Sequence, residues 1–359
     1  MNIRNLQIYL RKNKIDVSIF MSLNSTTYDN NLYYFSGYSG NGILIIPKSS
    51  RPFLVVPEME REKASKTSKV RSIIVWKKKE DLFELLRELF KKKKIRSKVI
   101  GLDLFSISVL LFRDFKKGLK KSKFKDISNI CRFLRTTKTK EEIKTIRKAF
   151  SIANKILIKT IRNFKRFKTE LDVANYLKIE SIKKGCELSF PSIVASGKNA
   201  SMPHYSPTNC KLKKGFCVID FGVRYQGYCT DITRTIFLGK PSERENEIYN
   251  ILLDSQKKAI KQVKNGTSCS DLYNSVVENL GDHSKYFTHG LGHGVGLNIH
   301  ELPNLKDKSK DNIEKNMVFT IEPGIYISGK LGIRIEDTLL FSNKTEILTK
   351  VPKHLITIR

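Results

Sequence analysis

The sequence predicts two domains: a small α/β domain, then a larger α+β domain with helices outside a mostly antiparallel sheet. The chain has 359 residues, and single hydrophobic cores tend to split beyond about 250–300 residues. Hydrophobic residues make up 40% and charged residues 28%, which is typical of a globular protein. Short apolar runs dominate residues 1–130 and long periodic helices follow residue 139, so residues 131–138 are the expected linker.

The first domain, residues 1–130, contains four short runs that are apolar, β-branched or aromatic. Polar residues, glycine or proline bound each run, as at the ends of strands. A stretch with leucines at helical spacing, flanked by lysines, predicts a surface helix at 82–89. The four expected strands are 17–21, 42–46, 53–56 and 73–76.

The second domain, residues 139–359, opens with a helix whose start is marked by a capping box. The hydroxyl of Thr139 can satisfy a free amide of the first turn, and Glu142 can reach back to the Thr139 amide. Apolar residues follow at helical spacing as far as Leu157. Further helices are expected at 169–184, 242–266 and 268–280, and strands at 215–223, 228–238, 317–322, 324–327 and 333–341.

The charge is strongly unbalanced: 67 basic against 35 acidic residues give a formal net charge of +32. Such an excess raises the question of a nucleic-acid or membrane partner. The lysines are spread along the whole chain, which favours solvated surfaces, so no membrane and no specific nucleic-acid partner are expected. No run approaches the ~18 apolar residues of a membrane span and the start lacks a signal-peptide core, so a soluble, cytoplasmic protein is expected. Six cysteines without paired spacing are expected to be free thiols.

The run FCVIDFGVRYQGYCTDITRTIFL predicts a hairpin that carries two aspartates. With a turn at Tyr225-Gln226, Asp220 and Asp231 lie directly opposite each other, with Cβ atoms ~5 Å apart. Like charges in that position destabilise a hairpin, and a divalent metal is the simplest remedy. A register shifted by one residue would instead place the two side chains on opposite faces.

Three of the six histidines, His289, His293 and His300, lie within a glycine-rich segment of twelve residues. An extended backbone would put His289 and His293 on one face, while the glycines let a ligand or another strand approach closely. A lone histidine is more often a core or surface residue, but this grouping favours a site.

Two acidic residues, Glu322 and Glu336, lie in apolar strand-like runs. Buried acids need a partner. The alternatives are an ion pair between Arg334 and Glu336, which share a face, and a simple turn acid before Pro323. Two aspartates, one histidine and two glutamates together form an oxygen-rich set suited to two divalent ions.

The ordered set Asp220, Asp231, His293, Glu322 and Glu336 resembles the metal ligands of pita-bread-fold metallopeptidases, specifically Xaa-Pro aminopeptidases and prolidases. Residues 30–38 (NNLYYFSGY) resemble a motif of the creatinase-like N-terminal domain of this family, and residues 133–149 resemble its interdomain junction. Methionine aminopeptidases share the catalytic fold but lack that N-terminal domain, so they fit less well.

The resemblance implies two divalent ions, Mn or Co, with Zn or Fe as alternatives. It implies that Asp220 chelates one ion, that His293 and Glu322 serve the other, and that Asp231 and Glu336 touch both, with a bridging hydroxide as nucleophile. Glu322 is then the proton acceptor. The remaining implied residues are substrate-binding and catalytic histidines and groups that hold the carboxylates: His204, His289 and His300, and Arg334 and Tyr326.

The activity implied by the resemblance is removal of an N-terminal residue that precedes proline, as in an Xaa-Pro aminopeptidase, with Xaa-Pro dipeptidase (prolidase) as the alternative. In prolidases an arginine, suited to a free carboxylate, commonly stands where this chain has Asn304, which favours longer peptides. A more distant alternative is a non-catalytic, basic binding protein of the same fold. The presence of all five ligands argues against it and against creatinase-like amidinohydrolases. A homodimer is implied by the resemblance alone.

Overall fold

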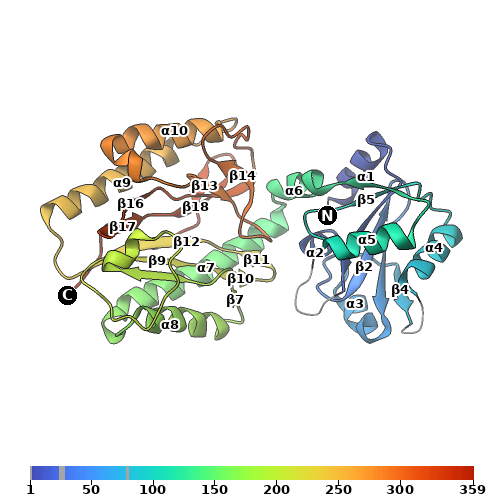
Figure 1. Ribbon diagram of the computed structural model, residues 1–359, viewed down its shortest axis with the longest axis horizontal. Coiled ribbons are helices and arrows are strands. Elements are labelled where there is room, and N and C mark those ends of the chain that lie inside the picture. The colour runs from blue at the N-terminus through green and yellow to red at the C-terminus, as the bar shows by residue number, and fades with distance from the viewer. Residues whose placement is uncertain (1, 24–28, 78–80) are drawn as a thin grey trace. The chain divides into compact units, whose positions relative to one another are not determined.

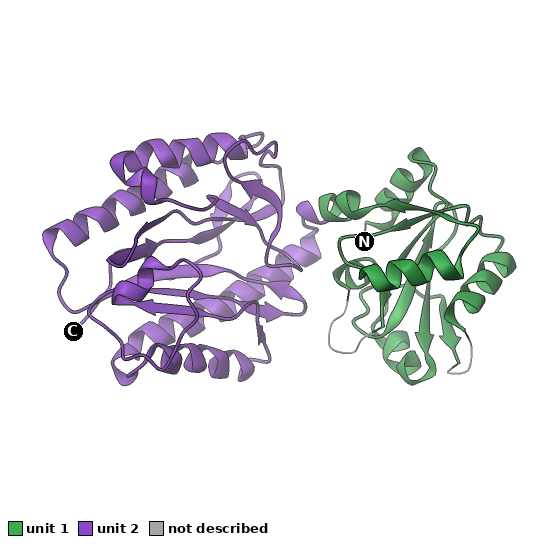
Figure 2. Ribbon diagram, in the orientation of Figure 1, with its two compact units in different colours: residues 1–134 green, residues 135–359 purple. Residues whose placement is uncertain are grey.

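The computed structural model describes residues 2–23, 29–77 and 81–359 and forms two compact units, Met1–Leu134 and Arg135–Arg359 (Figure 2). The division falls near the end of helix α6 (Ser128–Thr136), which occupies most of the range 131–138. Among the described helices, none has the length and apolarity needed to cross a membrane.

The first unit is an α/β layer structure around a six-stranded sheet with strand order β4-β3-β2-β1-β5-β6 (Figure 1). The four strands predicted here are confirmed, and β5 and β6 were not foreseen. The strands are β1 Val17–Ser22, β2 Gly42–Pro47, β3 Phe53–Pro57, β4 Ile73–Trp76, β5 Val99–Leu102 and β6 Lys123–Asp126. The helices are α1 Ile3–Lys12, α2 Asn30–Ser36, α3 Arg61–Thr67, α4 Leu82–Lys92 and α5 Val109–Gly118, with a 3₁₀ turn at Glu58–Glu60.

Both faces of this sheet are covered by helices, which explains why the central strands β1 and β2 are buried along their whole length. Along β2, Leu44 and Ile46 pack into a cluster with Leu6 of α1. Their neighbours Ile43 and Ile45 point to the opposite face, where the cluster includes residues of α4 and α5. Strand residues alternate between faces, so one short run supplies both cores.

The second unit is α+β, as predicted, and its helices lie outside the strands: α9 and α10 on one side, α7 and α8 on the other (Figure 1). Strand pairs in the described residues of this unit are antiparallel, except that β12 pairs with β20 in parallel. The helices are α7 Lys140–Arg162, α8 Glu170–Ile182, α9 Glu243–Gln262 and α10 Cys269–Leu280, with 3₁₀ turns at Phe164–Arg166, Gly197–Ser201 and Gly281–Tyr286.

The strands of the second unit form four sheets, with orders β11-β10-β7, β20-β12-β9-β8, β14-β13-β15-β18-β19 and β16-β17. They are β7 Glu187–Leu188, β8 Ile193–Ser196, β9 Gly215–Phe221, β10 Val223–Tyr225, β11 Tyr228–Cys229, β12 Ile232–Leu238, β13 Gly292–Gly294, β14 Glu301–Leu305, β15 Met317–Ile321, β16 Gly324–Ile327, β17 Leu331–Arg334, β18 Asp337–Phe341, β19 Thr345–Ile347 and β20 Thr357–Ile358.

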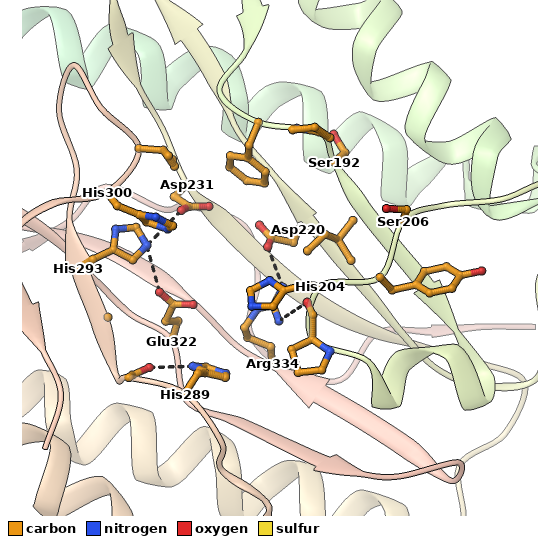
Figure 3. A pocket seen from close by; sticks show the side chains of 18 of the residues that line it. Ser192, His204, Ser206, Asp220, Asp231, His289, His293, His300, Glu322 and Arg334 are labelled. Carbon is orange, nitrogen blue, oxygen red and sulfur yellow. Dashed lines mark hydrogen bonds and ion pairs between the residues drawn. The ribbon is translucent and has the colours of Figure 1, made fainter. Parts of the chain in front are cut away.

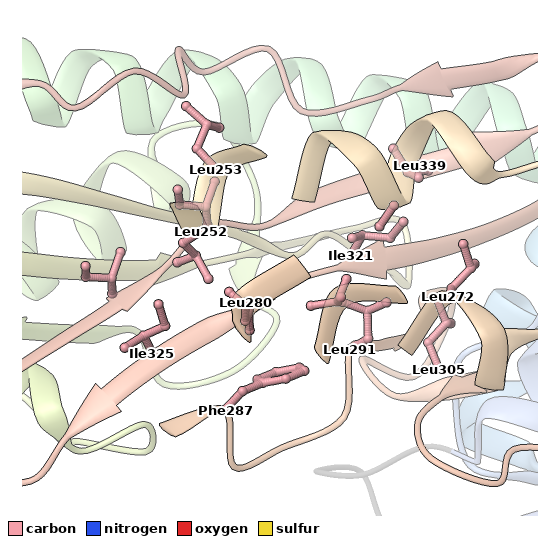
Figure 4. Packing of buried hydrophobic residues seen from close by; sticks show 14 of the residues in the cluster. Leu252, Leu253, Leu272, Leu280, Phe287, Leu291, Leu305, Ile321, Ile325 and Leu339 are labelled. Atoms are coloured by element: carbon pink, nitrogen blue, oxygen red, sulfur yellow. The ribbon is translucent and has the colours of Figure 1, made fainter. Parts of the chain in front are cut away.

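A large apolar core packs α9 and α10 against the strands β15 to β18 (Figure 4). Leu252 of α9 and Leu272 of α10 are fully buried in it, together with Ile321 and Leu339 of the sheet. Burial of this kind contributes roughly 25 cal/mol per Å² of apolar surface. The core therefore fixes the backbone at Ile321, the residue directly before Glu322.

The predicted strand 333–341 is broken into β17 and β18. Ile321 pairs with Asp337 and Gly324 pairs with Arg334, so one register continues across the break. Pro323 lies at the interruption, where it has no N–H to donate to a ladder. In this register Glu322 would stand opposite Glu336. Both residues lie in the interruption, so neither takes part in regular strand pairing.

The predicted capping box at the start of α7 is confirmed. Glu142 N donates to Thr139 Oγ1 at 3.3 Å, and Thr139 N donates to Glu142 Oε2 at 2.9 Å. The same reciprocal pattern starts α8 and α9. These local signals explain why the helix starts could be found from sequence.

We predict that Thr139→Ala lowers the free energy of unfolding by about 1 kcal/mol, because the first turn of α7 loses its cap. Thr145→Ala, inside the same helix, is the matched control and should be neutral or slightly stabilising, since alanine favours helix. Urea unfolding followed by circular dichroism measures both variants. Equal effects of the two substitutions would contradict the assigned cap.

Candidate metal centre and active site

The hairpin that carries Asp220 and Asp231 turns one residue later than predicted. Tyr225 pairs with Tyr228, so the turn is Gln226-Gly227 and not Tyr225-Gln226. Both turn residues have positive φ, 49° and 82°. Tight hairpin turns require that conformation because it matches the strand twist, and glycine adopts it without steric cost.

This shift makes the two aspartates diagonal neighbours, so their predicted direct opposition is wrong. Asp220 pairs with Thr233 across the ladder. Asp231 lies two residues before Thr233, so its side chain points to the same face. The prediction that both carboxylates share one side of the hairpin is confirmed.

Glu336 joins the aspartates in a compact group of three carboxylates. One ligand oxygen from each residue lies within 4.8 Å of the others. Two oxygens of these residues, Asp220 Oδ1 and Glu336 Oε1, are buried and have no hydrogen-bond partner in the described part of the chain. Buried carboxylate oxygens normally have a partner, and a cation would supply one to both.

His293 of β13 and Glu322, which directly follows β15, lie next to this group. His293 Nε2 lies 3.2 Å from Glu322 Oε1 and 3.5 Å from Asp231 Oδ2 (Figure 3). Its Nδ1 lies 3.1 Å from the carbonyl oxygen of Gly294. A neutral ring with its proton on Nδ1 would direct the Nε2 lone pair at the carboxylates, as a metal ligand requires.

The acids and the imidazole shift one another's pKa values. Burial, and then the charges of Glu336 and Asp220, raise the pKa of Asp231 well above its ordinary value. Burial also raises the pKa of Glu336. Burial is the largest influence on Glu322 and opposes its ionisation, but the hydrogen bond and charge of His293, together with the nearby Arg334, outweigh it and lower the pKa of Glu322 to about 2. Without a metal, a charged His293–Glu322 pair therefore lies beside two carboxyl groups, those of Asp231 and Glu336, that resist ionisation.

Arg334 is a buried cation that contacts three parts of the site. Its Nη2 donates to Asp220 Oδ2 at 2.7 Å, and its Nη1 donates to the Tyr326 hydroxyl at 2.8 Å. Its Nε donates to Thr233 Oγ1 at 3.1 Å, and that hydroxyl donates to Glu336 Oε2 at 2.7 Å. Arg334 therefore reaches Glu336 through Thr233, while its direct acidic partner is Asp220.

His289 is oriented by a chain of hydrogen bonds that starts at Arg334. The Tyr326 hydroxyl lies 3.0 Å from His289 Nε2, and His289 Nδ1 lies 2.7 Å from the carbonyl oxygen of Gly290. A carbonyl oxygen only accepts, so Nδ1 carries the proton and Nε2 accepts from Tyr326. Burial lowers the pKa of His289, which favours this neutral ring.

The predicted residues converge on one cavity of about 650 Å³ (Figure 3). Its lining includes Asp220, Asp231, His204, His289, His293, His300, Glu322, Arg334 and Asn304. His204 and His300 are exposed within it, and the rings of His293 and His300 lie edge to face with centroids 4.1 Å apart. Glu336 and Tyr326 are not part of the lining and are buried behind it.

The loop before His300 is anchored by Glu301, a residue that the sequence did not single out. Glu301 is buried, with Lys138 and Arg135 each 3.3 Å from one of its oxygens. Its Oε1 also accepts from Asn298 N at 3.1 Å. These contacts fix the backbone on both sides of His300.

Two threonines of the site were also missed. Thr233 joins Arg334 to Glu336, and Thr320 Oγ1 donates to Glu322 Oε1 at 3.0 Å. Each threonine stands two residues from an acid of the site, in or next to an extended strand. Residues two apart in a strand share a face, so the spacing was the signal that could have found them.

Comparison with known families gives two matches that together span most of the chain. Residues 144–343 match metallopeptidase family M24, and residues 2–137 match the creatinase/prolidase N-terminal domain. The pita-bread catalytic domain and the creatinase-like N-terminal domain expected from the resemblance are confirmed by these matches.

Similar individual proteins include both dipeptidases and an aminopeptidase. The chain is 37% identical over 335 residues to the Xaa-Pro dipeptidase of Pyrococcus furiosus, covering 91% of this chain and 92% of that protein. It is similar to the prolidase structure from Pyrococcus horikoshii OT3, with TM-score 0.88, 34% identity and 99% of both chains covered. It is also similar to the X-Pro aminopeptidase structure from Thermotoga maritima, with TM-score 0.89, 30% identity, and 96% and 98% covered.

We predict that Asp231→Asn leaves the metal-free protein as stable as the wild type, or more stable, at neutral pH. The pKa of Asp231 is raised in the folded state, so stability falls as the pH rises from the unfolded carboxyl pKa through the folded one. Asparagine has no proton to lose and avoids this fall. Scanning calorimetry of chelator-treated protein should show a melting temperature of Asp231→Asn equal to or above that of the wild type at about pH 7. Any such advantage should be lost at about pH 4.

Asp282→Asn, at an exposed position, is the control and should leave the melting temperature unchanged at both pH values. A clear drop in melting temperature for Asp231→Asn at neutral pH would mean that the carboxylates do not repel one another.

Proposed function

The chain is a member of metallopeptidase family M24 with a creatinase/prolidase N-terminal domain, a Xaa-Pro peptidase, and from this premise we propose that it is a metal-dependent Xaa-Pro dipeptidase. The observation that carries the metal-dependent part is the gathering of two aspartates, two glutamates and a histidine around buried carboxylate oxygens that have no partner among the described residues. The dipeptidase part is supported by the curated relatives from Pyrococcus furiosus and Pyrococcus horikoshii, 37% and 36% identical to this chain. It replaces the aminopeptidase preference drawn from the sequence.

We propose that the five residues hold two divalent ions, Mn or Co, with Zn or Fe as alternatives. Carboxylate oxygens with a single imidazole suit such ions, and supply decides between them. Bound there, the ions would polarise the scissile carbonyl and lower the pKa of a nearby water. The metal ligands of this proposal are Asp220, Asp231, His293, Glu322 and Glu336.

In this proposal Glu322 moves the proton. Its carboxylate accepts a proton from the attacking water and passes it to the proline nitrogen, which cannot leave unprotonated. Thr320 holds Glu322 Oε1 by a hydrogen bond of 3.0 Å, so the carboxylate keeps its direction. The exposed rings of His204 and His300 reach the substrate in the cavity and orient the scissile bond.

Proline explains why a dedicated peptidase is needed. The bond before proline is a tertiary amide without an N–H, so a peptidase that binds that donor rejects the substrate. A site shaped around the ring accepts it.

We predict that a chelator removes activity, that added Mn or Co restores it, and that Glu322→Gln lowers kcat at least about a hundredfold, because an amide cannot take the proton. Glu314→Gln, exposed and outside the cavity lining, is the matched control and should keep full activity. Release of proline from Xaa-Pro peptides is the assay. Full activity after chelation would end the metallopeptidase proposal.

A second candidate, Xaa-Pro aminopeptidase, is favoured by one observation. Asn304 lines the cavity and carries no charge. A dipeptidase must bind the free carboxylate of proline, for which an arginine is the better partner. In the dipeptidase proposal that carboxylate is bound by the histidines of the cavity instead.

Peptide length separates the two candidates. For the dipeptidase, we predict that kcat/KM is about tenfold higher for Xaa-Pro than for the matched Xaa-Pro-Yaa, because a following residue displaces the carboxylate from its donors. Asn304→Arg should then change this ratio little. Faster cleavage of Xaa-Pro-Yaa, with Asn304→Arg shifting the preference towards dipeptides, would select the aminopeptidase.

We also propose that the protein works in the cytoplasm as a homodimer. None of the six cysteines, which all lie in the described part of the chain, forms a disulfide, and five of them are buried, which suits a reducing compartment. The dimer is supported by Phe105, Val109 and Leu110, large apolar side chains that are 66–77% exposed in the first unit. A non-catalytic binding protein would have no need of the complete five-residue set.

A further inference from the structure

Glu170 is a buried carboxylate that the mechanism above does not use. It is the first residue of α8, and its relative exposure is 0%. Its Oε1 accepts hydrogen bonds from Ser196 N (2.7 Å), Ser196 Oγ (2.9 Å) and Asn199 Nδ2 (3.0 Å). Burying a carboxylate is costly, and the three donors and the positive end of the helix dipole offset that cost here.

Asn199 links this carboxylate to Tyr205. The side-chain amide has two N–H groups: one points to Glu170, and the other donates to the Tyr205 hydroxyl at 3.0 Å. With both donors used, the amide has one orientation. Glu170 therefore sets the position of the Tyr205 ring through a single intermediate side chain.

Tyr205 directly follows His204, which projects into the cavity (Figure 3). On the other side of His204, the carbonyl oxygen of Pro203 accepts from Arg334 Nη1 at 3.3 Å. The segment 203–205 is thus held at one end by Arg334 and at the other by Tyr205. His204 is exposed in the cavity, so its direction depends on these two flanking attachments.

The backbone of α8 holds the same loop further along. Glu170 N donates to Cys210 O, and Leu171 N donates to Thr208 O, both at 3.1 Å. Thr208 Oγ1 in turn lies 3.2 Å from the Tyr205 hydroxyl. Hydrogen bonds from the start of α8 therefore hold the loop 203–210 in position.

We propose that Glu170 is a positioning residue for His204. Through Asn199 and Tyr205 it fixes the segment 203–205 and thereby directs the His204 ring at the substrate. This inference rests on the proposed function, because it assigns how one histidine of that site is held.

Three substitutions test the chain of contacts. Glu170→Met keeps the length but removes the acceptor oxygen, and should lower kcat/KM for an Xaa-Pro dipeptide roughly tenfold to a hundredfold, as misplaced catalytic groups do. Glu170→Gln keeps an acceptor at the Oε1 position and should stay within about threefold of the wild type. Tyr205→Phe removes only the hydroxyl at the far end of the chain and should resemble Glu170→Met, even if the latter folds poorly.

A double-mutant cycle with His204→Ala separates positioning from a general structural effect. In the His204→Ala background, Glu170→Met and Tyr205→Phe should cost no further kcat/KM, although any loss of melting temperature should persist. A loss of the same size in both backgrounds would overturn the proposal, and so would full activity of Glu170→Met or of His204→Ala.

Histidine NMR gives a readout that does not need activity. With six histidines in the chain, the His204 ring signal can be assigned from its absence in His204→Ala. Glu170→Met and Tyr205→Phe should shift or broaden that signal and leave those of His283 and His354 unchanged; an unmoved His204 signal overturns the proposal. If the wild type cleaves no Xaa-Pro peptide, the proposed function fails, while this measurement still decides the role of Glu170.

Discussion

The hydrogen bonds donated by the Arg334 guanidinium are the interactions on which the rest of the site depends. Its three nitrogens donate to Asp220, Tyr326 and Thr233, and through these partners it orients Glu336 and His289 as well. A further bond from Nη1 to the Pro203 carbonyl holds the segment before His204. A buried guanidinium must be fully hydrogen-bonded, so the positions of these groups are tied to one another. Arg334 thus holds in place both the carboxylates that could bind metal and the histidines that face substrate.

Two interrupted hairpins bring the acidic residues of the site close to Arg334. One is interrupted at Gly222, where an added Cβ would lie 1.9 Å from the carbonyl oxygen of Thr230. The other is interrupted at Pro323, between β15 and β16. At each break the ladder hydrogen bonds stop while the pairing register is kept. The acidic side chains of the two hairpins thus meet at the cavity or directly behind it. The fold itself therefore concentrates negative charge, which only a cation or a proton can make stable.

Local signals explain what the sequence could predict, and long-range contacts explain what it could not. The start of α7 was found because Thr139 and Glu142 form a capping box within one turn. The aspartate hairpin was predicted from two strand-like runs joined by a short turn, but its register was missed because the turn was placed at Tyr225-Gln226 although Gly227 is the residue that suits it. Thr233 and Glu170 look ordinary in sequence, since a threonine in a strand and an acid at a helix start are common. Their roles arise from partners 103 and 26 residues away.

The stoichiometry of metal binding tests the central claim most directly. Metal-free protein titrated with Mn(II) should bind two ions per chain by calorimetry, and electron paramagnetic resonance should show the two ions magnetically coupled, because Asp231 and Glu336 would be shared between them. Glu336→Gln should abolish the coupled signal while the metal-free protein stays folded. Fewer than one ion bound per chain, or two ions without magnetic coupling, would contradict the account.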